Sequence, residues 1–227
     1  MKMLSSRKMG LCALIVLVAA LCAAPAMAGD VTVYTNLGSG QSFNNNGGWT
    51  LGTWYNGANQ AMASPFTPTT TTNLADALLA VTYFGGDNPP LDVYLESDNS
   101  GQPSGTIMDT LAQQGTLPDF GSSGPVTTFT CTTCPLMDAG STYWLVAVQP
   151  DPDSLQTWNN VWNSATGPLA FNETGSNTGP WSTFTGDMDA FEVDGTTTTT
   201  PEPVSMLLMG TFLSLAGGLL SKKKRGL

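Results

Sequence analysis

The side chains of this 227-residue chain that could do chemistry are mainly carboxylates, hydroxyls and amides. Seven Lys and Arg residues stand against 17 Asp and Glu residues, and there is no His. Every basic residue lies before residue 9 or after residue 221, whereas every acidic residue lies between Asp30 and Glu202. The stretch 30–202 therefore carries a formal charge of −17, with no cationic side chain to offset it.

A body without cations excludes several classes of function. Nucleic-acid affinity depends mainly on Lys and Arg neutralising phosphates, so we expect no nucleic-acid partner. Without His, Lys or Arg there is no His-activated nucleophile, no Schiff-base lysine and no clamp for a phosphoryl group. A glycoside hydrolase needs only two carboxylates across a cleft, but no spacing marks such a pair. We therefore expect a non-enzymatic protein, with a carboxylate glycoside hydrolase as the enzymatic alternative.

Two cysteines of the body, Cys131 and Cys134, are separated by two residues. Outside the cytoplasm such a pair is expected to form a disulfide that closes a small loop. A redox role would need a cation or a helix N-terminus to stabilise the thiolate, and Pro135 follows the pair. A zinc site would need two further ligands, which only carboxylates could supply. Free thiols, a redox pair and a metal site are the alternatives to a structural disulfide.

Acidic residues recur at positions typical of loops and could bind calcium, which takes about six to eight oxygen ligands. The candidates that we favour are Asp151 and Asp153, followed by Asp187 and Asp189. No acidic cluster has the spacing of an EF-hand loop or an RTX repeat. Solvated acidic loops are the alternative, and calcium is the only cofactor that the sequence suggests.

Aromatic side chains of the body could stack on sugar rings. In the segment 158–162, two indoles flank two amides, and an extended backbone would place both indoles on one face. Trp158 and Trp162 are therefore candidates for carbohydrate binding. Core packing is the alternative, and it is the expected role of Trp144, which lies in an apolar segment.

The N-terminus predicts a secretory signal peptide over residues 1–28. Three basic residues precede the apolar run 11–21, and Ala26-Met27-Ala28 forms a small-x-small cleavage site before Gly29. We expect export across the inner membrane and removal of this segment. An uncleaved anchor is the alternative.

The C-terminus predicts a short transmembrane helix. Residues 204–220 are apolar and would span about 26 Å, at the short end of what crosses a bilayer. The basic flank is expected to stay on the cytoplasmic side, which leaves the acidic body outside. The Thr-rich residues 196–200 form a linker, either O-glycosylated or an unmodified spacer. The basic residues are Lys222, Lys223, Lys224 and Arg225.

The tripeptide Pro201-Glu202-Pro203, the short apolar segment and the basic cluster follow one another at the end of the chain. In this order, residues 201–227 resemble the PEP-CTERM sorting signal of exopolysaccharide-producing Gram-negative bacteria. The resemblance implies that an exosortase, a membrane cysteine protease or transpeptidase, recognises Pro201, Glu202 and Pro203 and cleaves nearby. The body would then be released from or attached to the cell surface. An ordinary single-pass anchor is the alternative.

Residues 29–195 predict a single all-β domain. Apolar and polar residues alternate in 91–96, as in a strand with one buried face, and 143–148 is apolar on both faces. Residues 73–80 have the composition of a helical turn, but their neighbours favour a strand. Short strands with turn residues between them indicate an antiparallel β-sandwich, jelly-roll-like in topology. The predicted strands are 31–34, 49–53, 61–67, 78–84, 91–96, 107–113, 126–131, 142–148 and 190–193.

A second resemblance covers residues 31–195 and depends on turns and aromatic positions. The ordered segments resemble the choice-anchor R domain, an extracellular β-rich module named for carrying one of several surface-anchoring tails. This resemblance implies a surface module and supplies no catalytic residues. The segments are 41–43, 48–50, 61–66, 95–105, 139–145, 158–159 and 190–195.

These patterns predict an exported cell-surface or extracellular-matrix protein with a structural or adhesive role in an exopolysaccharide or biofilm matrix. A carbohydrate-binding module, calcium-assisted or not, is the alternative function. The expected partners are an exosortase, the inner membrane during sorting, and extracellular polysaccharide.

Overall fold

The computed structural model describes residues 29–53, 57–85, 88–151 and 153–196. These residues form strands joined by turns and loops, and none of them lies in a helix. No helix that could cross a bilayer therefore occurs in these ranges. The predicted signal peptide and sorting segment lie outside the described residues. The strands are β1 (Asp30–Thr35), β2 (Phe43–Thr53), β3 (Asn59–Phe66), β4 (Thr72–Leu79), β5 (Val81–Gly85), β6 (Asp92–Asp98), β7 (Pro103–Gln113), β8 (Thr127–Thr130), β9 (Leu136–Met137), β10 (Tyr143–Val148), β11 (Leu155–Val161), β12 (Thr166–Asn172), β13 (Ser182–Asp187) and β14 (Phe191–Thr196).

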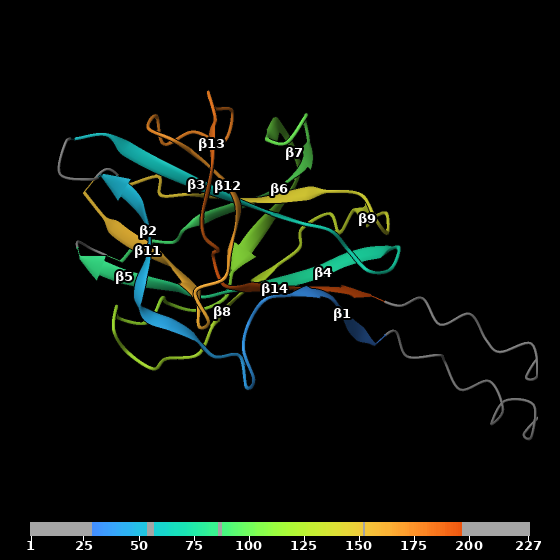
Figure 1. Ribbon diagram of the computed structural model, residues 1–227, viewed down its shortest axis with the longest axis horizontal. Coiled ribbons are helices and arrows are strands. Elements are labelled where there is room, and N and C mark those ends of the chain that lie inside the picture. Colours follow the sequence, from blue (N-terminus) through green and yellow to red (C-terminus); the bar gives the residue numbers. More distant parts are fainter. Residues whose placement is uncertain (1–28, 54–56, 86–87, 152, 197–227) are drawn as a thin grey trace, which may run out of the picture. The chain divides into compact units, whose positions relative to one another are not determined.

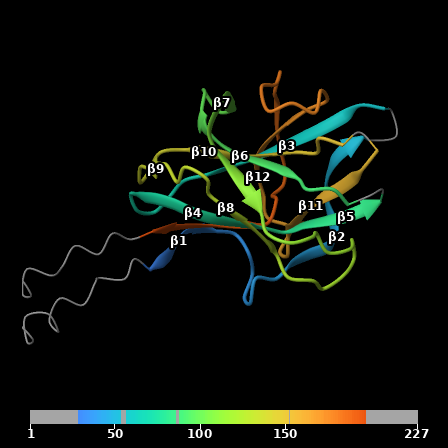
Figure 2. The ribbon, with the colours of Figure 1, turned by 180° about the vertical axis from the view of Figure 1, so that it is seen from behind.

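Neighbouring strands pair antiparallel, which confirms the predicted all-β antiparallel class (Figure 1). The strand order is β1-β14-β4-β8-β7-β6-β10-β3-β2-β11-β5. Outside this path, β12 pairs with β3, β13 with β12, and β9 with β4. The view from behind shows the same strands around a common interior (Figure 2).

One hydrophobic core receives side chains from strands that lie far apart in this order. Val33 of β1, Leu145 of β10 and Trp158 of β11 all belong to it. The chain passes from β4 directly to β5 through Ala80, whose backbone N–H donates to Ala190 O. Because an open flat sheet could not bring these strands to one core, the sheet curves around it.

The central strand β10 is buried on both faces, as its apolar sequence predicts. Leu145 packs in the main core, whereas Trp144 and Val146 pack in a second cluster on the opposite face. That second cluster includes Ala63 of β3 and contacts Trp181. Trp144 is therefore a core residue, as expected from its segment.

The predicted strands differ from the observed ones where the sequence lacks apolar alternation. The predicted strand 78–84 is the end of β4 followed by β5, and residues 73–80 are strand up to Leu79. β9, β11, β12 and β13 are not among the predicted strands. β13 is largely exposed and rich in Ser and Thr, so no apolar pattern marks it. The predicted linker 196–200 overlaps β14 by one residue, and its remainder lies outside the described residues.

The first and last strands of the described domain lie side by side. Asp30 at the start of β1 is the register partner of Thr196 at the end of β14. Figure 1 shows the two strands together at one end of the molecule. The segments that precede and follow the domain in sequence therefore join it at the same pair of strands.

Candidate functional site

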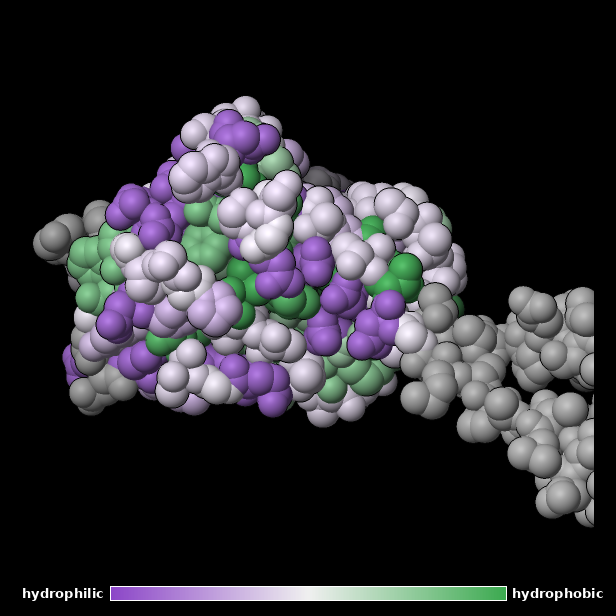
Figure 3. Space-filling view, turned by 90° about the horizontal axis from the view of Figure 1, so that it is seen from below, coloured by the Kyte–Doolittle hydropathy of each residue, from purple (hydrophilic) through white to green (hydrophobic). Residues whose placement is uncertain are grey.

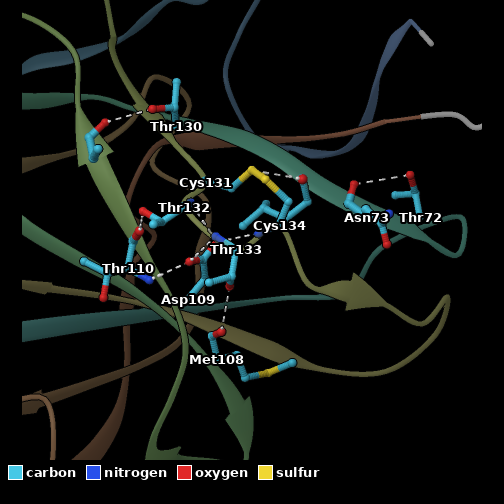
Figure 4. The surroundings of a disulfide bond; sticks show 12 residues. Thr72, Asn73, Met108, Asp109, Thr110, Thr130, Cys131, Thr132, Thr133 and Cys134 are labelled. Atoms are coloured by element: carbon cyan, nitrogen blue, oxygen red, sulfur yellow. Dashed lines mark hydrogen bonds between the residues drawn. A yellow bond between two sulfur atoms is a disulfide. The ribbon is translucent and has the colours of Figure 1, made fainter.

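The two cysteines of the body form the predicted disulfide. Cys131 and Cys134 are bonded, with their Cα atoms 5.0 Å apart, in the loop between β8 and β9 (Figure 4). The loop is also fastened to β4, because Cys131 N donates to Ala75 O and Leu74 N donates to Pro135 O. The bond closes a turn beside the sheet rather than lying in an open cleft.

Asp109 of β7 holds this disulfide loop, although no pattern in the sequence marks it as a site residue. Its carboxylate accepts hydrogen bonds from the backbone N–H groups of Thr132, Thr133 and Cys134, at distances of 3.0–3.2 Å. The carboxyl is buried, and it also accepts from Thr110 N. Successive N–H groups that converge in this way form a binding site for an anion, and here Asp109 occupies it. The loop is therefore held structurally, and no local sequence signal links Asp109 to residues more than 20 positions away.

The first pair of calcium candidates is engaged within its own loop. The Asp151 carboxylate accepts hydrogen bonds from Asp153 N and from the Ser154 hydroxyl. The hydrogen bond from Ser154 and that from Asp153 lower the pKa of Asp151. Among the described residues, no group of three or more Cys, Asp or Glu side chains could hold a metal ion. Calcium binding at these residues stays a prediction.

The two residues of the second pair of calcium candidates differ in their burial. Asp187 is partly exposed and its backbone carbonyl accepts from Trp49 Nε1, whereas Asp189 is fully buried. Asp189 Oδ2 accepts a 2.8 Å hydrogen bond from the Ser64 hydroxyl, and its Oδ1 is buried without a hydrogen-bond partner. Burial raises the pKa of Asp189 well above its ordinary range, and the bond from Ser64 offsets this only in part. This environment favours the neutral acid.

The two candidate sugar-binding indoles do not share a face. Trp158 is 0 % exposed, its Nε1 donates to Ala190 O, and its ring packs on Phe191. The prediction of a sugar contact is wrong for Trp158, because its side chain belongs to the core. Trp162 lies beyond the end of β11 and is 68 % exposed. The strand ends at Val161, and a turn carries Trp162 outward.

A second carboxylate that the sequence analysis did not single out as a site is Glu96 of β6. Gly105 N donates to its Oε2 at 2.6 Å, and Asn177 Nδ2 lies 3.4 Å from its Oε1. Next to it, Trp144 Nε1 donates to the exposed Asp98. Burial raises the pKa of Glu96, while the bonds from Gly105 and Asn177 lower it. Because Glu96 is inaccessible and ties β7 and the loop of Asn177 to β6, it does not form a glycosidase-like pair with Asp98.

A shallow groove lies at some distance along the chain from these carboxylates. It is lined by residues from 114–118 and 125–128, none of which is titratable, and its volume is ≈ 230 Å³. Ligand pockets usually measure roughly 300–1,000 Å³ and contain a few convergent polar groups. The groove therefore offers no acid or base for catalysis.

No known protein family, curated protein or solved structure matches this chain. The resemblances of residues 31–195 and 201–227 therefore stay predictions. Of the two candidate sugar-binding indoles, Trp162 is the exposed one, whereas the disulfide loop and the buried Asp189 have structural roles.

We predict that Asp109→Asn lowers the free energy of unfolding by about 1–3 kcal/mol, because the N–H groups of the disulfide loop lose their charged, buried acceptor. Urea unfolding of the oxidised protein measures this cost, with the exposed Asp138→Asn as the matched control. In a Cys131→Ala/Cys134→Ala background the cost should shrink, because the open loop can turn its N–H groups to water. An equal cost in both backgrounds would contradict a coupling between Asp109 and the closed loop.

We predict that Asp189→Asn becomes stabilising relative to the wild type as the pH rises. A pKa raised on folding contributes stability that is present at low pH and is lost as pH rises toward the folded pKa. The difference in free energy of unfolding should grow by about 1.4 kcal/mol per pH unit over that window. Urea titrations between pH 4 and 8 test this, with the exposed Asp153→Asn as control. Parallel curves for Asp189→Asn and wild type would refute it.

Proposed function

We propose that this protein is exported, processed by an exosortase, and displayed at the cell surface or in the extracellular matrix. There it plays a non-enzymatic structural or adhesive role in an exopolysaccharide or biofilm matrix. The observation that carries the proposal is the separation of charge. All seven cations lie in the two terminal segments, and the folded body between them is purely acidic.

The acidic body suits a hydrated extracellular setting. The described ranges contain no Lys, Arg or His, so no carboxylate can pair with a cationic side chain within these ranges. On the face drawn in Figure 3, hydrophilic residues are scattered among apolar ones and do not gather in one patch. A surface of one charge sign resists self-association and attracts counter-ions diffusely. The disulfide also fits an oxidising compartment.

The arrangement of the ends supports a tethered module. The sequence before Asp30 and the sequence after Thr196 leave from one strand pair, so a C-terminal anchor would hold the domain by this strand pair. We also propose that the curved sheet is a jelly-roll-like sandwich of the choice-anchor R kind, because one core is shared by strands from both ends of the sheet order.

A second candidate function is carbohydrate binding, and the exposure of Trp162 favours it. An indole that is 68 % exposed on the turn between β11 and β12 offers a flat apolar face to a sugar ring. Asn163 follows it, although its Oδ1 already accepts from Ala165 N. This function is compatible with the matrix role and differs from it in requiring saturable binding.

The sorting proposal predicts that deletion of residues 201–203 leaves an unprocessed, membrane-bound form. The deletion removes the tripeptide that the exosortase would recognise, so the mature mass should increase by the uncut tail. Deletion of three threonines, residues 198–200, is the matched control and should still be processed. Intact-mass spectrometry of protein from the native host measures both. An unchanged mature mass after removal of 201–203 would contradict exosortase processing.

The carbohydrate-binding candidate predicts that Trp162→Ala weakens binding of matrix polysaccharide by roughly tenfold or more, or about 1.4 kcal/mol. Tryptophan fluorescence of the purified protein, titrated with the polysaccharide with and without chelator, measures this. Leu136→Ala removes another exposed apolar side chain and is the control, with no expected effect. Equal affinities of both variants would contradict a Trp162 site. Release of reducing ends by the wild type would contradict the non-enzymatic role.

A further inference from the structure

Two carboxylates face each other across the pair formed by β4 and β14. Asp76 and Asp194 are direct register partners, next to an irregularity in the pairing. Opposite residues of an antiparallel pair have Cβ atoms about 4.5–5.5 Å apart, and like charges at this spacing destabilise the pair. The position matters because β14 lies between β1 and β4 and is the last strand of the domain.

Both carboxylates keep one oxygen away from water without a partner. Asp76 Oδ1 and Asp194 Oδ1 are buried and accept no hydrogen bond. A buried acceptor without a donor costs free energy, and two ionised ones side by side cost more. Since the described ranges lack Lys, Arg and His, no cationic side chain of theirs can relieve this arrangement.

The groups around the pair are acidic or neutral. β1 contributes Asp30 and β14 contributes Glu192, and both act on Asp76. The other strands that pair with β4, which are β8 and β9, contain no titratable side chain. Thr130 of β8 faces Asp76. The adjoining cysteines are bonded to each other and do not titrate. Burial, followed by the charges of Asp194, Asp30 and Glu192, raises the pKa of Asp76 to about 6.

We propose that Asp76 and Asp194 share one proton and form a pH-sensitive clasp that fastens β14 to β4 in mildly acidic surroundings and loosens it at neutral pH. With one proton present, the hydroxyl of one carboxyl donates to the buried oxygen of the other, so a single proton serves both. When the proton leaves, two carboxylates repel each other across the strands.

The clasp acts on the strand from which the C-terminal segment departs. Asp194 lies two residues before Thr196, the last residue of β14. A pKa that is raised on folding contributes stability below the unfolded value of 3.8, and this contribution is lost as the pH rises through about 6. The opening of β14 should therefore become easier between pH 5 and 7, while strands remote from the pair keep their protection.

The test combines carboxyl ¹³C NMR titration with amide hydrogen exchange of the mature protein at pH 5 and 7. We expect Asp76 to titrate near pH 6, and protection factors of β14 amides to fall by about tenfold from pH 5 to 7. In Asp194→Asn the Asp76 midpoint should move toward 3.8, and in Asp76→Asn the change in protection should disappear. The exposed Asp138→Asn should behave as the wild type.

Three results would overturn the clasp. One is an Asp76 titration that does not respond to Asp194→Asn, because the two groups would then not share a proton. A second is a wild-type β14 protection that stays constant between pH 5 and 7. The third is protection at pH 7 that is restored by added calcium in the wild type but not in Asp76→Asn, because the pair would then be a cation site. If a variant fails to fold, the wild-type β14 protection at pH 5 and 7 still tests the clasp without it.

Discussion

The absence of cations from the folded body is the constraint on which its other features depend. A buried carboxylate usually meets an Arg, Lys or metal ion, and in the described residues only neutral donors and protons are available. Asp109 is stabilised by backbone N–H groups of the disulfide loop, and Glu96 by the backbone N–H group of Gly105 in β7 and the side chain of Asn177. Asp189 has a single hydroxyl donor, and its burial favours the neutral acid. Carboxylates therefore make the surface acidic and, where they are buried, also order the segments that donate hydrogen bonds to them.

The parts of the fold that the sequence predicted are those in which neighbouring residues carry the information. The apolar run of β10, the alternation of β6 and the spacing of Cys131 and Cys134 were sufficient, because each is a local pattern. The contacts of Asp109 with the disulfide loop and of Asp189 with Ser64 were not predictable, since more than 20 and more than 100 residues separate the partners. Trp158 shows that a local pattern can also mislead. Its spacing from Trp162 suggested a shared face, but the end of β11 at Val161 separates a core residue from a surface residue.

The adjacency of β1 and β14 gives the domain a mechanical property. A pull on Thr196 that is directed along the axis of β14 acts on a strand that is hydrogen-bonded to β1 on one side and to β4 on the other. Antiparallel hydrogen bonds lie perpendicular to the strands, so such a pull loads the bonds on both sides in shear and they must yield together. A strand at the edge of a sheet, pulled sideways, would instead unzip one bond at a time. A domain held by this strand would resist drag from its surroundings most strongly when the pull is directed along β14.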